Sequence, residues 1–99
     1  MSTDGGTADF DLDAPWRLDS QVAVRPERFG ALLYHFGTLR LSFLKSPQLL
    51  QVIQALPQTP SARAACARAD VPAAQLPSYE RALAALVATN MLIPAGETT

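Results

Sequence analysis

The alternation of apolar and polar residues predicts strands in the first half of the chain. Residues 21–25 (QVAVR) alternate with a period of two, which is typical of a strand. Residues 31–36 (ALLYHF) are apolar and aromatic and lie between two glycines, which favours a central strand. Residues 26–30 then form a turn, and residues 37–38 (GT) form a short hairpin turn because glycine tolerates a positive φ.

The following strand, residues 39–45, has the clearest alternation in the chain. Leu39, Leu41 and Phe43 fall on one side of it, and we expect this side to face the core. The opposite side carries Arg40, Ser42 and Leu44.

Helix signals follow these strands. Ser46-Pro47 is an N-cap followed by a proline at the first helical position, and apolar residues then recur at helical spacing up to Pro57. Ser61 begins a second, alanine-rich helix, and Ser78 is expected to cap a third helix that ends at Asn90. Three strands followed by three helices have the proportions of a winged-helix unit.

The chain of 99 residues fits one domain, which we place at residues 20–94. Residues 1–19 hold five aspartates and one arginine, and we expect them to form a disordered acidic tail. Trp16 and Leu18 either pack onto the domain or simply end this tail. Residues 95–99 are expected to form a second disordered tail. The chain after residue 19 carries seven Lys/Arg against four Asp/Glu, so the folded part is mildly basic.

The sequence predicts neither a catalytic site nor a metal site. His35 is the only histidine and lies in a predicted strand, which favours a structural role. Cys66 is the only cysteine and lies among alanines, so we expect a small buried side chain and no internal disulfide. Phosphate-binding glycine motifs are absent from the sequence. We therefore expect no cofactor, no bound metal and no enzymatic activity.

The composition also bears on location. The N-terminus lacks the basic and apolar regions of a signal peptide, and no apolar run approaches the roughly 20 residues that span a bilayer. A single cysteine suits a reducing compartment. We expect a cytoplasmic protein without membrane contact.

A DNA-binding function is the alternative that a helix trio brings with it. The third helix of a winged-helix regulator reads base edges with polar side chains. Here that helix offers Glu80, Arg81 and Asn90, and Glu80 repels phosphate. We therefore do not expect a nucleic-acid partner, and a winged-helix DNA-binding regulator remains the second hypothesis.

The predicted strand at residues 39–45 lies at a sheet edge if the strands pair in chain order. Unpaired backbone groups at such an edge can accept a peptide as an additional strand, and the third helix would form the other wall of the groove. Arg40 and Lys45 would suit an acidic peptide. The same apolar residues could equally be plain core. The candidate peptide-binding residues are Arg40, Leu41, Ser42, Phe43, Leu44, Lys45, Tyr79, Leu83, Leu86 and Val87.

Residues 25–47 (RPERFGALLYHFGTLRLSFLKSP), and LSFLKSP most specifically, carry a resemblance to a known family. The chain resembles, up to about residue 93, the PqqD-like RiPP recognition elements, and among them the chaperones of mycofactocin biosynthesis. The resemblance implies an α+β fold, with a three-stranded antiparallel sheet followed by a three-helix winged-helix-like bundle, and it implies no catalysis.

The resemblance also implies partners. Such proteins bind the leader of a ribosomally made precursor peptide as an extra strand between the third strand and the third helix. They present it to a radical S-adenosylmethionine maturase, and the iron–sulfur clusters and S-adenosylmethionine belong to that enzyme. An interaction subunit that docks on the enzyme without binding the peptide is a third possibility.

Overall fold

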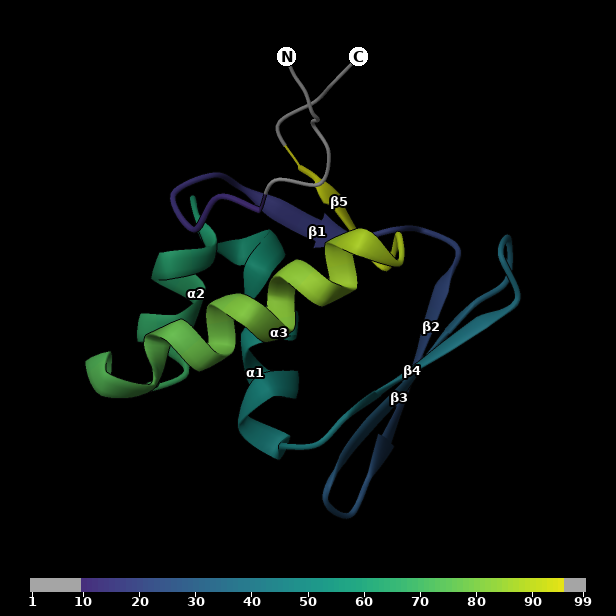
Figure 1. Cartoon of the computed structure of the whole chain (residues 1–99), viewed down its shortest axis with the longest axis horizontal. Helices are drawn as coiled ribbons and strands as arrows, with labels where there is room; N and C mark the ends of the chain where they lie inside the picture. Colours follow the sequence, from purple (N-terminus) through teal and green to yellow (C-terminus); the bar gives the residue numbers. More distant parts are fainter. Residues whose placement is uncertain (1–9, 96–99) are drawn as a thin grey trace.

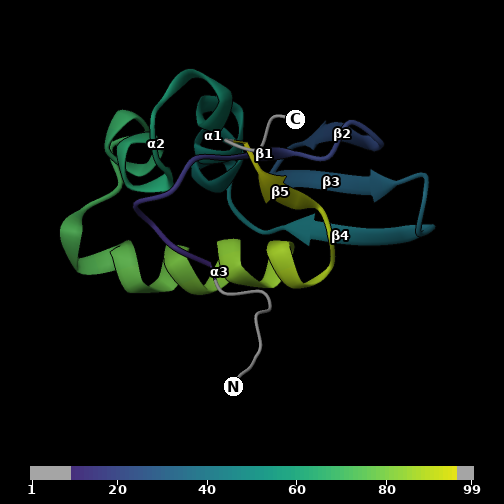
Figure 2. The same cartoon turned by 90° about the horizontal axis from the view of Figure 1, so that it is seen from above.

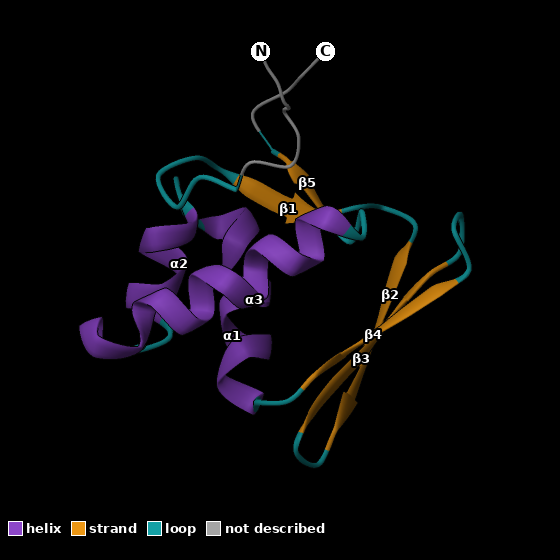
Figure 3. Cartoon of the chain, in the orientation of Figure 1, coloured by secondary structure: helices purple, strands orange, loops and turns teal. Residues whose placement is uncertain are grey.

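A computed structural model of the chain describes residues 10–95. It has two antiparallel sheets and three helices, so the predicted α+β class, with an antiparallel sheet and three helices, is confirmed (Figures 1 and 3). The larger sheet has the order β2-β3-β4 and consists of β2 (Val22–Glu27), β3 (Gly30–His35) and β4 (Arg40–Leu44). The smaller sheet pairs β1 (Trp16–Leu18) with β5 (Leu92–Pro94). The helices are α1 (Pro47–Ala55), α2 (Ala62–Arg68) and α3 (Leu76–Ala88), with single 3₁₀ turns at Leu56–Gln58 and Ala73–Gln75.

The face of the larger sheet that packs on the helices is the opposite of the one predicted. Leu44 is buried, whereas Leu41 and Phe43 are 61% and 45% exposed. The register explains this, because Leu44 lies opposite Ala31 and its side chain therefore shares a face with Ala31 and Leu33. We call this the inner face, and α1 packs on it. The outer face carries the intervening side chains, and its apolar members are Leu32, Tyr34, Leu41 and Phe43.

Both turns of this sheet differ from the prediction. The strand β2 continues through Pro26 to Glu27, so only residues 28–29 separate it from β3. Proline is tolerated there because β2 is an edge strand. In the second turn it is Leu39, at φ 62°, and not Gly37 that adopts a left-handed conformation. The N–H of Leu39 donates to the carbonyl oxygen of His35 over 2.8 Å, which makes a wider turn than the predicted one.

His35 has the structural role that the sequence favoured. It is buried, and its Nδ1 accepts hydrogen bonds from the N–H groups of Gly37 and Thr38 over 3.0 and 3.1 Å. Its Nε2 lies 3.5 Å from a carboxylate oxygen of Asp19. The imidazole thus holds the β3–β4 turn to the end of the N-terminal segment.

Two of the three predicted N-caps are confirmed. The Oγ atoms of Ser46 and Ser61 each accept a hydrogen bond over 3.1 Å, from the N–H groups of Leu49 and Ala64. The third is wrong, because α3 begins at Leu76 and contains Ser78 within its first turn. Pro77 explains the earlier start, since its fixed φ suits the first turn of a helix. At its other end, α3 ends at Ala88 with Thr89 as the C-cap, slightly before the predicted end, and Asn90 follows in a left-handed conformation at a φ of 65°.

The N-terminal segment from residue 10 is part of the fold, so the predicted tail of residues 1–19 is too long. Trp16 is 5% exposed, and its Nε1–H donates to the carbonyl oxygen of Asp11 over 2.9 Å. Leu12 is also buried. The guanidinium of Arg63 lies 2.8 Å from the carboxylate of Asp13, which lowers the pKa of that carboxyl. The strand that β1 pairs with is β5, and Arg17 lies opposite Ile93 in this pairing.

The predicted disorder of residues 1–9 and 96–99 lies outside the described residues. Ala95 belongs to the fold and not to the predicted second tail, since its N–H donates to the carbonyl oxygen of Pro15 over 3.1 Å. Within residues 10–95, no helix combines the length and the apolar composition that a membrane crossing requires.

The core lies between the inner face of the larger sheet, the three helices and the smaller sheet (Figure 2). Cys66 is buried there, as predicted, and burial raises the pKa of its thiol. The largest fully buried side chains of the core are those of Leu33, Leu44, Ile53, Leu56, Leu83, Met91 and Leu92.

Candidate functional site

The strand β4 forms one edge of the larger sheet. One hydrogen bond shows which residues of β3 direct their backbone groups toward β2 and which toward β4; we call this alternation the phase. The N–H of Phe36 donates to the carbonyl oxygen of Gln21 over 2.9 Å. Since hydrogen-bonded pairs alternate in an antiparallel ladder, the backbone N–H and C=O groups of Tyr34 and Leu32 also point toward β2. Those of the alternate residues Ala31, Leu33 and His35 point toward β4. Pro26, which has no N–H, lies opposite one of those residues, Ala31, in agreement with this phase.

The same alternation decides which groups of β4 are free. Arg40, Ser42 and Leu44 lie opposite residues of β3 that face them, so their backbone groups pair with β3. The N–H and C=O groups of Leu41 and Phe43 therefore point away from the sheet, at its open edge. These backbone groups have no strand partner among the described residues.

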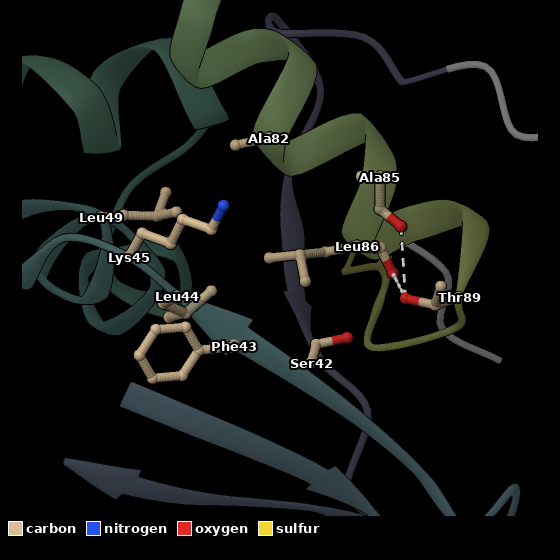
Figure 4. A pocket seen from close by; sticks show the side chains of 9 residues that line it. All are labelled: Ser42, Phe43, Leu44, Lys45, Leu49, Ala82, Ala85, Leu86 and Thr89. Atoms are coloured by element: carbon tan, nitrogen blue, oxygen red, sulfur yellow. Dashed lines mark hydrogen bonds between the residues drawn. The ribbon is translucent and has the colours of Figure 1, made fainter. Parts of the chain in front are cut away.

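A cavity of about 480 Å³ lies beside this edge, between β4 and α3 (Figure 4). Leu44 and Leu86 project from opposite sides of it, and Leu49 from α1 closes one end. Its lining consists of Ser42, Phe43, Leu44, Lys45, Leu49, Ala82, Ala85, Leu86 and Thr89.

The lining is mostly apolar. On α3, Ala82 and Ala85 have side chains too short to reach across the cavity, which keeps the space open. The hydroxyl of Thr89 donates to the carbonyl oxygens of Ala85 and Leu86 over 3.2 and 3.3 Å, so its proton is used within its own helix. Lys45 is the one charged residue of the lining, and it is exposed. Such a cavity can hold apolar side chains and one acidic group, and its lining offers no nucleophile–base pair.

Half of the predicted groove residues line the cavity. These are Ser42, Phe43, Leu44, Lys45 and Leu86. Arg40 and Leu41 lie on the same strand outside the cavity, and the Leu41 side chain belongs to the outer face.

The helix side of the prediction agrees less well with the structure. Leu83 is completely buried and belongs to the core beneath the groove. Tyr79 donates through its hydroxyl to Oε1 of Gln48 over 3.1 Å, which ties α3 to α1. Val87 is half-buried against the core and does not line the cavity.

Sequence reasoning missed four lining residues, namely Leu49, Ala82, Ala85 and Thr89. The last three recur at spacings of three and four residues, so they share one face of α3. This stripe of small residues is the signal in the sequence, because small side chains leave space beside a helix whereas large ones fill it. In residues 10–95, no three His, Cys, Asp or Glu side chains gather as a metal site would require.

The comparisons with known proteins agree on one family. A family model described as the peptide chaperone MftB family matches residues 15–93. The chain is 52% identical to the peptide chaperone MftB of Mycobacterium tuberculosis over 88 residues, which covers 89% of this chain and 81% of that protein. It is 54% identical to the peptide chaperone MftB of Mycolicibacterium smegmatis, over 86% of this chain and 83% of that protein.

A third relative, the peptide chaperone MftB of Mycobacterium ulcerans, is 51% identical over 90% of this chain and 82% of its own length. No solved structure gives a significant match. The family consists of chaperones rather than catalysts, so this protein is not an enzyme. Both the family model and the relatives cover most of the chain, which therefore belongs to the peptide chaperone MftB family.

Proposed function

We propose that this chaperone binds the leader of a ribosomally made precursor peptide as an additional strand along the free edge of β4. In this proposal it presents the peptide to a radical S-adenosylmethionine maturase in mycofactocin biosynthesis, in the cytoplasm. The three helices and the β3–β4 hairpin act as a winged-helix-like unit that holds a peptide instead of DNA.

The observation that carries the proposal is the open edge of β4 beside an apolar cavity. The backbone groups of Leu41 and Phe43 are in phase to pair with an incoming strand, which supplies affinity independent of sequence. Since α3 forms the far wall of the cavity, the added strand would lie between β4 and this helix. The alternative that these residues are only core accounts for Leu83 and Leu44, but not for an open edge beside a cavity.

The cavity adds selectivity to the backbone pairing. Alternate side chains of an added strand would point toward the inner face, where Leu44, Leu49 and Leu86 form an apolar surface. Lys45 lies beside Leu49 in the lining and would pair with a carboxylate of the peptide. We therefore expect the bound segment to combine apolar residues at every second position with an acidic residue near Lys45.

The chaperone would act by positioning. Holding the leader fixes one part of the precursor and raises the effective concentration of its reactive end at the maturase. All redox chemistry belongs to the partner in this proposal.

A calorimetric titration of the full chain with the synthetic precursor tests the proposal. We expect saturable binding with a stoichiometry of one and a negative heat-capacity change, because apolar surface is buried. A specific complex should form well below about 50 µM peptide, so absence of binding at that concentration would overturn the proposal. A scrambled peptide of the same composition is the matched control.

A further inference from the structure

The outer face of the larger sheet is apolar and uncovered. In the described part of the chain, every large hydrophobic side chain that is strongly exposed lies on the segment from Phe29 to Phe43. Phe29, Phe36 and Leu41 are 58%, 59% and 61% exposed. The helices all lie on the other side of this sheet (Figures 1 and 2). Contiguous exposed apolar surface of this kind marks an interaction site more often than chance.

The side chains of this face form one continuous patch. Leu32 lies opposite Phe43, and Tyr34 lies opposite Leu41, so these four are cross-strand neighbours. The patch is extended at each end by an aromatic pair in edge-to-face contact. The ring centroids of Phe29 and Phe43 are 5.7 Å apart, and those of Phe36 and Tyr34 are 4.9 Å apart.

The charges around the patch are positive. Arg25, Arg28, Arg40 and Lys45 are the basic residues of segment 20–45, and Glu27 is its one acidic residue. Arg25, which lies opposite Leu32, is 3.3 Å from the carboxylate of Glu27, and Arg40 lies opposite His35 on the inner face, so Arg28 contributes the uncompensated charge at the border of the patch. Two copies joined through this face would set like charges against each other, since a two-fold interface places the same patch on both sides. The charges therefore disfavour self-association and favour an acidic partner.

We propose that the outer face docks the maturase, through an apolar patch on that enzyme bordered by carboxylates. This inference rests on the proposed function, which supplies the partner. It separates the two binding tasks of the chaperone: the edge and inner side of β4 hold the peptide, and the outer side holds the enzyme.

The two surfaces meet at β4. Phe43 lines the cavity and also belongs to the aromatic pair with Phe29 on the outer face. A peptide strand added to β4 would extend the sheet, and its alternate side chains would enlarge the outer face. Enzyme docked there would contact the peptide as well as the chaperone. We therefore expect each ligand to strengthen binding of the other, by the same factor in both directions.

The test measures enzyme binding and peptide binding separately on the full chain. Phe29→Ser and Phe36→Ser remove exposed rings that do not line the cavity, and Arg28→Glu reverses a charge at the border. Arg81→Glu, an exposed arginine of α3, is the matched charge control. We expect each outer-face variant to weaken binding to the purified maturase about tenfold or more, with precursor affinity unchanged within about twofold. Circular dichroism verifies that the variants fold.

Each other outcome has a defined meaning. If all three outer-face variants bind the maturase as the wild type does, the outer-face inference is wrong while the proposed function stands. If the wild type binds peptide but no enzyme, the inference likewise fails. Self-association of the wild type at about 10 µM that the serine variants abolish would show that a second copy covers this face and would overturn the inference. Binding of neither ligand would remove the proposed function itself.

Discussion

Gly30 and Leu44 approach so closely that no side chain fits between them. A Cβ atom on Gly30 would collide with the backbone carbonyl oxygen of Leu44. Leu44 is the last residue of β4, and the chain turns there toward α1. The absence of a side chain at residue 30 thus allows the strand that forms the groove to bend onto the core.

The first prediction concerns this contact. Gly30→Ala should destabilise the fold by about 1–3 kcal/mol, as overpacking against backbone does, because the carbonyl of Leu44 cannot rotate away. Urea unfolding followed by circular dichroism measures the change. Gly37→Ala is the comparison and should cost less, since a Cβ there meets side chains, the flexible end of Gln21 and Cε1 of His35, and no backbone atom. Equal stability of Gly30→Ala and the wild type would contradict the contact.

The second prediction tests which backbone groups of β4 are free. Phe43→Pro removes an N–H that faces the open edge and should weaken precursor binding about fivefold or more, since one hydrogen bond contributes about 1 kcal/mol. Phe43→Ala separates the loss of the ring from the loss of the donor. Ser42→Pro should instead unfold the protein, because that N–H pairs with β3. If Ser42→Pro folds and Phe43→Pro does not, the assigned phase is wrong.

The third prediction fills the cavity. Ala85→Trp places a large side chain into the space of about 480 Å³ and should weaken precursor binding about tenfold or more while leaving the melting temperature within a few degrees. Ala85 is exposed, so the core is not disturbed. Ala88→Trp is the matched control, since Ala88 is also exposed on α3 but does not line the cavity. Undiminished binding by Ala85→Trp would place the peptide elsewhere.

The fourth prediction concerns the N-terminal segment. Trp16→Ala should lower the free energy of unfolding by about 3–5 kcal/mol, as other substitutions of a buried aromatic residue by alanine do. Chemical denaturation monitored by circular dichroism gives the value, because the chain has no other tryptophan for fluorescence. Arg17→Ala, on the same strand but exposed, should change little. A loss below about 1 kcal/mol would mean that β1 is dispensable.

The fifth prediction follows from the raised pKa of the buried Cys66 thiol. At pH 8 the native protein should react slowly with a thiol reagent, and unfolding in urea should make the reaction fast. The native state holds the thiol proton more tightly than the unfolded state does. The free energy of unfolding should therefore be unaffected below the pKa of the unfolded thiol, about 8.5, and should fall as the pH rises from there toward the pKa of the thiol in the native state. Cys66→Ala should remove that loss, and rapid native labelling would contradict the burial.

The sequence by itself determined the local elements, because their signals depend on near neighbours. Ser46 and Ser61 cap the first two helices as predicted, and the third helix ends within two residues of Asn90. The run of residues 25–47 was also specific enough to indicate the family, which the comparisons confirm. The edge position of β4 followed from pairing in chain order, and the structure has that order.

Only the tertiary structure decided which side of each element faces what. Period-two alternation separates Leu41 and Phe43 from Leu44 but cannot say which set is buried, because that depends on where α1 packs. The small residues of α3 line a cavity only because β4 stands opposite them at a distance. Trp16 joins the fold through pairing with β5, some 75 residues later in the chain, and such long-range pairing leaves no local signal. The apolar outer face has the same origin, since the helices cover one side of the sheet and leave the other open.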